Sequence, residues 1–443
     1  MNPRHFSGFV ALAAAVAISG WANAEPLTAV ARSEVVQDLA AAMRARYVVP
    51  EVGAQAADLI ASRWSAGAYE SILMPGELAQ VLTSHLKEVA PDQHLGVESD
   101  ANPNAVFNLA PPPKSEAGVV RADRLDDRIG YIEIVSFPPK ERFKPTLDRA
   151  MTALAGSRAL IIDVRRNTGG DPAAVSYLAS FLIPPGSMTH INDIVSRQPG
   201  TSDLTRQAFY SEPTPVSFSG IPLRVLTSAS TFSGGEEFAY DIQGLGIGAV
   251  VGERTRGGAN PTAPTKLRHG FTVLVPFARA ENPYTKTNWD GRGVQPDVSS
   301  TTAEAFSTAL QDLGGPAQAA VEDASRAQVF APRSAAAAGS EAAVRRLLGE
   351  ISSGNPNYAA MTERAESATR RRLEQTSATL AGLGPLRTVT FVEVDAFGGD
   401  LFETRFENGA ARVAIALNQD GRIDAWALLQ PTTTEADLVQ LPR

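Results

Sequence analysis

The feature that most constrains the fold is the alternation of strand-like and helix-like segments between residues 128 and 300. Strand-like runs are RIGYIEIVSF, ALIIDV, PLRVLT, GAVVG and FTVLVPF, and helical patterns lie at 142–156, 172–183 and 233–243. Such alternation favours a sheet covered by helices, because each element must bury its apolar side against another layer. We therefore expect residues 100–312 to form a layered α/β core.

The segment before this core has helical periodicity. Apolar residues recur every four positions at Val35, Leu39, Met43 and Tyr47, which predicts helices with one buried face. Residues 25–99 are therefore expected to form a helical N-terminal domain.

The segment after the core changes character at an Ala, Pro, Gly and Ser-rich stretch, residues 313–339, which we interpret as a linker. Beyond it, 341–383 is helical in pattern and 386–430 is strand-rich. Asn408-Gly409 and Asp420-Gly421 each lie between strand-like runs, the strongest short-range signal for a hairpin. Residues 340–443 should thus form an α+β accessory module with an antiparallel sheet, similar in outline to cystatin-like or nuclear-transport-factor-like domains.

The N-terminus has the pattern of a signal peptide. Arg4 and His5 precede the apolar run Phe9 to Ile18, and Ala22-Asn23-Ala24 provides a cleavage site. We expect residues 1–24 to be removed and the protein to be periplasmic or secreted, without a membrane span. The chain has no cysteine, so its stability must come from core burial. A net charge of −8 argues against nucleic-acid binding.

Two motifs carry candidate chemistry. A buried strand, Leu160 to Val164, runs into Asn167-Thr168-Gly169-Gly170, where paired glycines allow backbone N–H groups to face an anion. A second strand, Leu223 to Leu226, runs into a turn that places Ser233 at a helix N-terminus. Each motif also has an ordinary interpretation: paired glycines are common in tight turns, and serine is a common helix cap.

Four segments taken together resemble the core motifs of the C-terminal-processing (tail-specific) serine peptidases: DVRRNTGG, TSASTFSGGEEFAYD, GAVVGERTRGGANP and NPYTKTNWDGRGVQPDV. The resemblance covers residues 30 to 310 and is strongest to the branch named for interphotoreceptor retinoid-binding protein. It implies a ClpP/crotonase-like core, a serine-type peptidase activity with Ser233 as nucleophile, and an oxyanion hole from Gly234 with Gly169 or Gly170. No metal or cofactor is implied.

The sequence departs from that family at the general base. Tail-specific members use a lysine where this chain has Gly258, and Lys266 lies eight residues further on. His94, in PDQHLGVE, resembles the catalytic histidine of tricorn-type relatives, and Asp290 matches the position of their acid. A Ser233–His94–Asp290 triad is therefore expected, with Glu237 or Lys266 as the alternative acid or base.

The spacing also restricts substrate recognition. About 30 residues separate His94 from the first core strand, too few for a PDZ domain. Specificity must then come from the cleft or from the C-terminal module, which is a candidate site for a partner. The expected partner is a peptide or protein substrate. A non-catalytic binding protein for a hydrophobic ligand or peptide is the alternative, because the vertebrate namesake of the branch carries retinoids.

Overall fold

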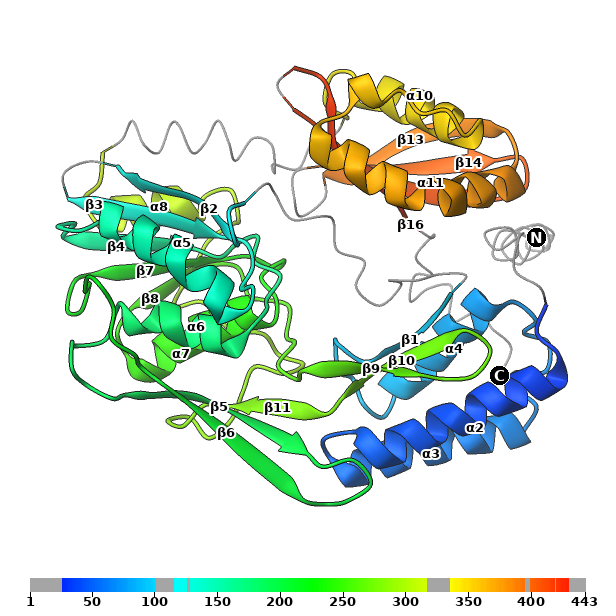
Figure 1. The fold of residues 1–443 in the computed structure, drawn as a ribbon, viewed down its shortest axis with the longest axis horizontal. Helices are drawn as coiled ribbons and strands as arrows, with labels where there is room; N and C mark the ends of the chain where they lie inside the picture. The colour runs from blue at the N-terminus through cyan, green and yellow to red at the C-terminus, as the bar shows by residue number, and fades with distance from the viewer. Residues whose placement is uncertain are drawn as a thin grey trace, which may run out of the picture.

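The computed structural model describes residues 26–100, 115–125, 128–316, 335–394, 399–418 and 420–429. The predicted signal peptide and most of the predicted linker lie outside these residues. Figure 1 shows three regions: N-terminal helices, a central α/β unit and a C-terminal α+β module. The mixed α/β fold class predicted from the sequence is confirmed.

The N-terminal region consists of α2 (Ala29–Arg46), α3 (Pro50–Ser65) and α4 (Pro75–Lys87). The side chain of Thr28 caps α2, and prolines begin α3 and α4, where their missing N–H costs nothing. The predicted apolar face is present, because Val35, Leu39 and Met43 are completely or almost completely buried.

These helices pack on a small sheet that the sequence did not assign to them. Its strands are β1 (Gly96–Ser99), β10 (Phe271–Pro276) and β9 (Thr262–Lys266), all antiparallel. Phe271, Val273 and Val275 join the hydrophobic cluster of the helices. The run FTVLVPF is therefore a strand as predicted, but it pairs with β1 instead of joining the core sheet.

The central sheet has the order β12-β8-β7-β4-β3-β2. Its strands are β2 (Val119–Arg124), β3 (Ile129–Ile134), β4 (Ala159–Asp163), β7 (Leu223–Thr227), β8 (Ala249–Gly252) and β12 (Val298–Ser299). All neighbouring pairs are parallel except β2 with β3. A parallel sheet must be covered on both faces, which explains why β4 is buried at every position.

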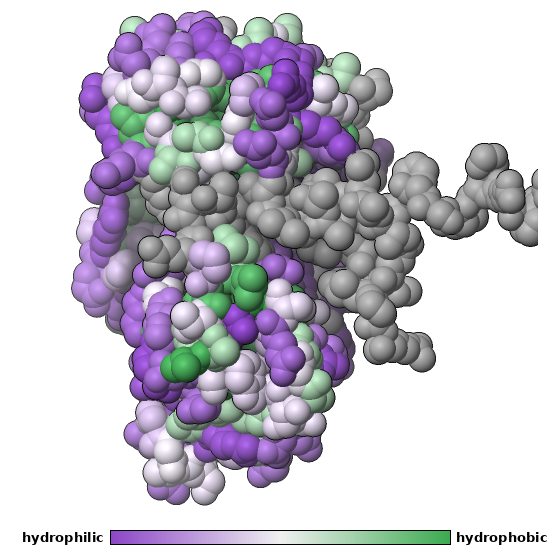
Figure 2. All heavy atoms as spheres, turned by 90° about the vertical axis from the view of Figure 1, so that its right-hand side faces the viewer, coloured by the Kyte–Doolittle hydropathy of each residue, from purple (hydrophilic) through white to green (hydrophobic). Residues whose placement is uncertain are grey.

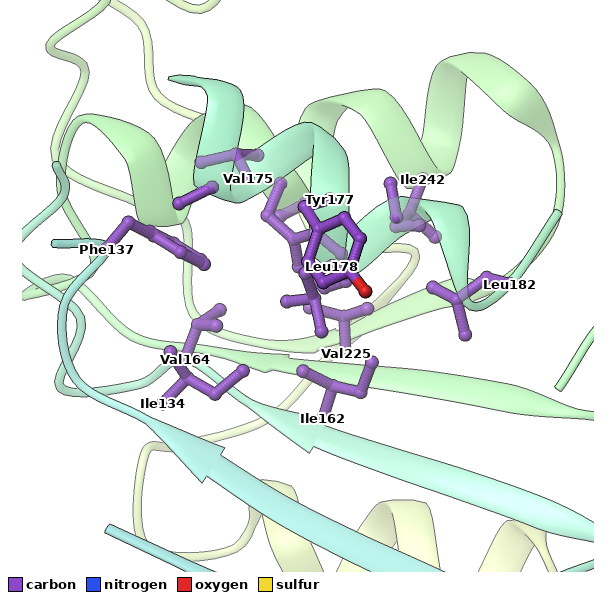
Figure 3. Close-up of a cluster of buried hydrophobic side chains, with 14 of the residues drawn as sticks. Ile134, Phe137, Ile162, Val164, Val175, Tyr177, Leu178, Leu182, Val225 and Ile242 are labelled. Carbon is purple, nitrogen blue, oxygen red and sulfur yellow. The ribbon is translucent and has the colours of Figure 1, made fainter. Parts of the chain in front are cut away.

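Helices cover the two faces unequally. Helices α5 (Lys140–Ala153), α6 (Pro172–Ser180) and α7 (Gly234–Leu245) pack on one face, while α8 (Ala305–Asp312) packs on the other. Figure 3 shows Ile162 and Val225 of the sheet against Val175, Leu178 and Ile242 of α6 and α7. Fully burying an aliphatic side chain of this kind contributes roughly 1.5–3 kcal/mol. This packing fixes the position of α7, whose first residue follows Ser233.

A second three-stranded sheet lies beside the core, with β5 (His190–Arg197) between β11 (Ala278–Glu281) and the exposed edge strand β6 (Leu204–Tyr210).

The C-terminal module contains α10 (Ser340–Ser352), the short η2 (Tyr358–Ala360) and α11 (Glu363–Leu383) on an antiparallel sheet. Its strands are β13 (Leu386–Val394), β14 (Asp400–Phe406), β15 (Ala410–Leu417) and β16 (Ile423–Leu429), paired in sequence order. Both predicted hairpins are present, β14–β15 and β15–β16. The module has its own hydrophobic cluster.

On the face drawn in Figure 2, hydrophilic side chains predominate and apolar ones gather only in small areas between them. Within the described ranges, every helix is too short or too polar to cross a membrane.

Candidate active site

The sheet topology brings three predicted motifs to one edge. Strands β4, β7 and β8 are parallel neighbours, so the loops that follow them leave from the same edge. These loops contain Gly169 and Gly170 after β4, Ser233 after β7 and Gly258 after β8. Ligands of open α/β sheets bind outside the carboxyl ends of the strands, which makes this edge the candidate site.

Ser233 lies in a strained turn at the start of α7. Its φ is 52° and its ψ is −118°, a conformation that costs a non-glycine residue of order 1–3 kcal/mol. The Ser233 N–H donates to the Glu236 carboxylate at 2.9 Å, which holds this conformation. Strain of this kind is found where a side chain must be presented for function.

The paired glycines lie directly against Ser233. A Cβ atom on Gly169 would stand 2.6 Å from the Ser233 Cβ and 3.0 Å from its Oγ, so only glycine fits. The Gly169 N–H donates to the Asn167 Oδ1 at 2.8 Å. The Gly170 nitrogen instead lies 3.1 Å from where a Cβ of Gly234 would stand. Both glycines therefore lie against the start of α7, and the N–H of Gly169 is already bonded to Asn167, which favours Gly170 as the oxyanion donor beside Gly234.

The space at Gly258 is filled by two rings. A Cβ atom there would stand 2.7 Å from Cε1 of His94 and would also collide with the ring of Phe232. A lysine cannot occupy this position without displacing His94. The histidine thus reaches the place at which the family resemblance puts the lysine base.

His94 arrives from the helical region, two residues before β1. β1 and β9 both begin near the end of β10, which explains why Asp92 and Asn260 meet. The side chain is buried, and its ring stacks on Phe232 with centroids 4.4 Å apart. Burial, assisted by the charges of Arg256 and Lys87, lowers the pKa of His94 to about 4. The imidazole is therefore neutral, as a proton acceptor must be.

Two carboxylates and one amide lie beside His94. Asp92 accepts the His94 backbone N–H at 2.8 Å, and its Oδ1 is 3.9 Å from His94 Nδ1. Asn260 donates to Asp92 at 2.7 Å, and Asp290 accepts the Ala259 N–H at 3.1 Å. Burial, followed by the charge of Asp92, raises the pKa of Asp290 to about 7. Asp290 therefore lies near Asp92 and Asn260, and the carboxylate that approaches the His94 ring is that of Asp92.

Glu236 ties the nucleophile turn to the Gly258 loop. Besides the Ser233 N–H, its carboxylate accepts the N–H groups of Gly257 and Gly258 and the hydroxyl of Thr255, at 2.5 to 2.8 Å. Burial raises the pKa of Glu236 to about 7 although these donors oppose the shift. All its oxygens are engaged in positioning backbone, which leaves little capacity for proton transfer.

The two alternative residues lie elsewhere. Lys266 is on β9, donates to Thr272 and lines a surface groove with Asp38 of α2. Glu237 is buried against Asn192 of β5 and Asp241, one turn further along α7; burial raises its pKa to about 8. The Glu237 N–H donates to the Ser233 carbonyl oxygen at 2.9 Å, which is a backbone contact within helix α7.

Three other histidines form hydrogen bonds away from this site. His85 is bonded to Tyr69, His190 to Asp193 and His269 to Glu34.

Sequence reasoning missed three charged residues of this neighbourhood. Asp92 could have been found from the Asp-x-His spacing. Arg256 and Lys87 carry no local signal, because only the fold brings α4 and the β8 loop together.

The chain belongs to peptidase family S41. Residues 128–300 match this family, and residues 27–129 match the N-terminal domain of peptidase S41 in eukaryotic IRBP. The matches adjoin and together run from the helical region to the end of the central sheet.

Two curated relatives are similar to part of the chain. A chloroplastic C-terminal processing peptidase of Tetradesmus obliquus is 30% identical over 174 residues, 39% of this chain and 35% of the relative. Carboxyl-terminal-processing peptidase 2 of Arabidopsis thaliana is 27% identical over 172 residues, 38% of this chain and 31% of the relative. The chain thus spans about a third of the length of these relatives.

Among solved structures, the photosystem II D1 C-terminal processing protease aligns with a TM-score of 0.42 and 16% identity, covering 62% of this chain and 94% of that chain.

Proposed function

We propose that this protein is a serine-type peptidase in which Ser233 is the nucleophile and His94 the general base. The observation that carries the proposal is that the His94 ring fills the space at Gly258 and stacks on Phe232, the residue that precedes Ser233. A serine alcohol is a weak nucleophile without a base, and this arrangement supplies one where the lysine of related enzymes is missing.

The reaction follows acyl-transfer chemistry. The Ser233 Oγ attacks the carbonyl carbon of a peptide bond while His94 accepts the hydroxyl proton. The resulting oxyanion faces the N–H groups of Gly234 and Gly170, whose preorganised donors stabilise it. His94 then gives the proton to the departing amine, and water releases the acyl group from Ser233 by the same route in reverse.

The acid that orients the imidazole is assigned to the Asp92–Asp290 pair. Asp290 was the residue expected from the sequence. The 3.9 Å distance to His94 Nδ1 favours Asp92 for the direct role, with Asp290 placed behind it near Asn260. An acid in this position holds the imidazole in one orientation and stabilises its charged form.

The N-terminal pattern supports export to the periplasm or the outside of the cell, where the substrate would be a peptide or protein. The alternative of a hydrophobic-ligand carrier is less well supported, because the groups in and around the Gly258 loop are polar and charged: Asp92, His94, Glu236, Arg256 and Asp290.

The test compares four variants with wild type. Ser233→Ala should lower kcat by 10³-fold or more, by analogy with other triads. Ser230→Ala, three residues earlier in the same loop, is the matched control and should retain activity. His94→Ala should be severely impaired and Lys266→Ala should not. A folded Ser233→Ala protein with full activity would refute the proposal.

A further inference from the structure

One buried asparagine serves both carboxylates of the acid pair. Asn260 is 7% exposed and lies in the loop after β8, two residues before β9. Its Nδ2 donates to Asp92 Oδ2 at 2.7 Å, and the same side chain acts on Asp290 as a hydrogen-bond donor. A side-chain amide has two N–H donors and no charge. Asn260 can therefore interact with both acids without adding a charge of its own.

Backbone contacts hold the Asp290 segment against the loop that carries Asn260. The Ala259 N–H donates to Asp290 Oδ1 at 3.1 Å, and the indole N–H of Trp289 donates to the Gly258 carbonyl oxygen at 2.9 Å. Trp289 is itself buried, so this arrangement is fixed by packing. The Asn260 side chain thus has a defined position relative to the acid pair.

The two acids compete for negative charge. Burial, followed by the charge of Asp92, raises the pKa of Asp290 to about 7, and burial also raises the pKa of Asp92. Two carboxyl groups that share a buried site do not both ionise readily, so one of them tends to hold a proton. Only Asp92 is known to approach the His94 ring, with 3.9 Å between Oδ1 and Nδ1. The position of the charge within the pair therefore matters for His94.

The hydrogen bonds favour a charge on Asp92. Among the groups that oppose the effect of burial on its pKa, the Asn260 amide has the largest effect, ahead of the His94 N–H and the charge of Lys87. On Asp290 the same amide has a smaller effect than a backbone N–H. A hydrogen bond to a carboxylate stabilises its ionised form. Asn260 therefore favours ionisation of Asp92 over that of Asp290.

We propose that Asn260 is a positioning residue that keeps the negative charge of the acid pair on Asp92, next to the His94 ring. This inference rests on the proposed function. An ionised Asp92 stabilises the imidazolium that forms when His94 accepts the Ser233 proton, whereas a protonated Asp92 does not. Asn260 therefore acts on the reaction through Asp92.

Other charged and titratable groups also surround the two acids and His94. They come from neighbouring elements: Lys87 at the end of α4, Tyr47 directly after α2, Glu236 of α7 and Arg256 of the loop after β8. The cations favour ionised acids, and the Glu236 charge opposes them. All four groups are kept in the variants below, so a difference between the pH profiles of these variants reports on Asn260 and the acid pair.

The experiment measures kcat/KM of the mature protein on a peptide as a function of pH. In Asn260→Ala, Asp92 loses a donor to its charged form, so its pKa rises and the acid limb should move to higher pH by about one unit. Activity should then fall about 10-fold near neutral pH and recover at alkaline pH. In the double variant Asn260→Ala with Asp290→Asn, the competing acid is removed, so the acid limb should return toward that of wild type.

Asn282→Ala is the matched control, because Asn282 is also a buried asparagine that donates to a buried aspartate, Asp241 of α7, at 2.9 Å. It should lower the melting temperature without moving the acid limb. If Asn260→Ala does not fold, the isosteric Asn260→Asp takes its place. Its ionised carboxylate cannot donate to Asp92, so the acid limb should move in the same direction.

Three results would overturn the role of Asn260. The first is an acid limb that does not move, and the second is a loss of activity that is equal at every pH, as a purely structural role would produce. The third is a folded double variant that stays inactive at every pH, which would make Asp290 the orienting acid. Labelling of Ser233 by a fluorophosphonate separates the two proposals: a wild type that does not label refutes the proposed function, whereas one that labels with an unmoved acid limb in Asn260→Ala refutes only this inference.

Discussion

The most discriminating single substitution is Gly258→Ala. The added methyl group would stand 2.7 Å from Cε1 of His94, whereas carbon atoms in contact prefer about 3.5–4.0 Å. The imidazole must therefore move by about 1 Å. Because a displacement of that size at a catalytic group can cost about 100-fold, we expect kcat/KM to fall by that order.

The substitution should also destabilise the fold, since overpacking a buried site typically costs 1–3 kcal/mol. The assay is therefore kcat/KM on a peptide, measured well below the melting temperature of the variant. Gly349→Ala is the matched control: it lies in α10, and a Cβ there meets nothing within 4 Å. If Gly258→Ala is folded and as active as wild type, His94 is not the base in this position.

Further substitutions test the surrounding groups. Asp92→Asn should lower kcat/KM at least 10-fold by releasing the imidazole, and wild-type activity in this variant would return the orienting role to Asp290. Arg256→Ala removes a charge that lowers the pKa of His94, so the acid limb of the kcat/KM profile should move to higher pH, and an unmoved or lower limb would contradict this coupling. Burial raises the pKa of Glu237 from 4.5 to about 8, so wild type should lose stability as pH rises through that window. In Glu237→Gln the free energy of unfolding should fall less with rising pH, by up to a few kcal/mol at about 1.4 kcal/mol per pKa unit. If the free energies of unfolding of both proteins change equally between pH 5 and 8, the effect is excluded. A fragment of residues 26–316 should still react at Ser233, because the C-terminal module has a separate hydrophobic cluster, and a fragment that does not fold would make the module part of the active unit.

Local patterns were sufficient for most secondary structure and for the placement of Ser233. The strands β4 and β7 are apolar and short, each is followed by a glycine-rich turn and a helix, and the parallel pairing of such units brings their carboxyl ends together. The two turns could therefore be expected to meet.

The remainder depends on contacts between distant segments. FTVLVPF has the same local pattern as a core strand, and only its partner β1 decides the sheet to which it belongs. Asp92 and Asn260 are 168 positions apart in the chain. Arg256 and Lys87 have no motif, because only the fold brings the end of α4 and the loop after β8 together.

The central claim is tested most directly by treating the mature protein with a fluorophosphonate and identifying the labelled residue by peptide mass spectrometry. The account predicts a single modification on Ser233, with a labelling rate that falls at least 10²-fold in His94→Ala, in line with the loss of a general base. Labelling at another residue, or an unchanged rate in His94→Ala, would contradict it.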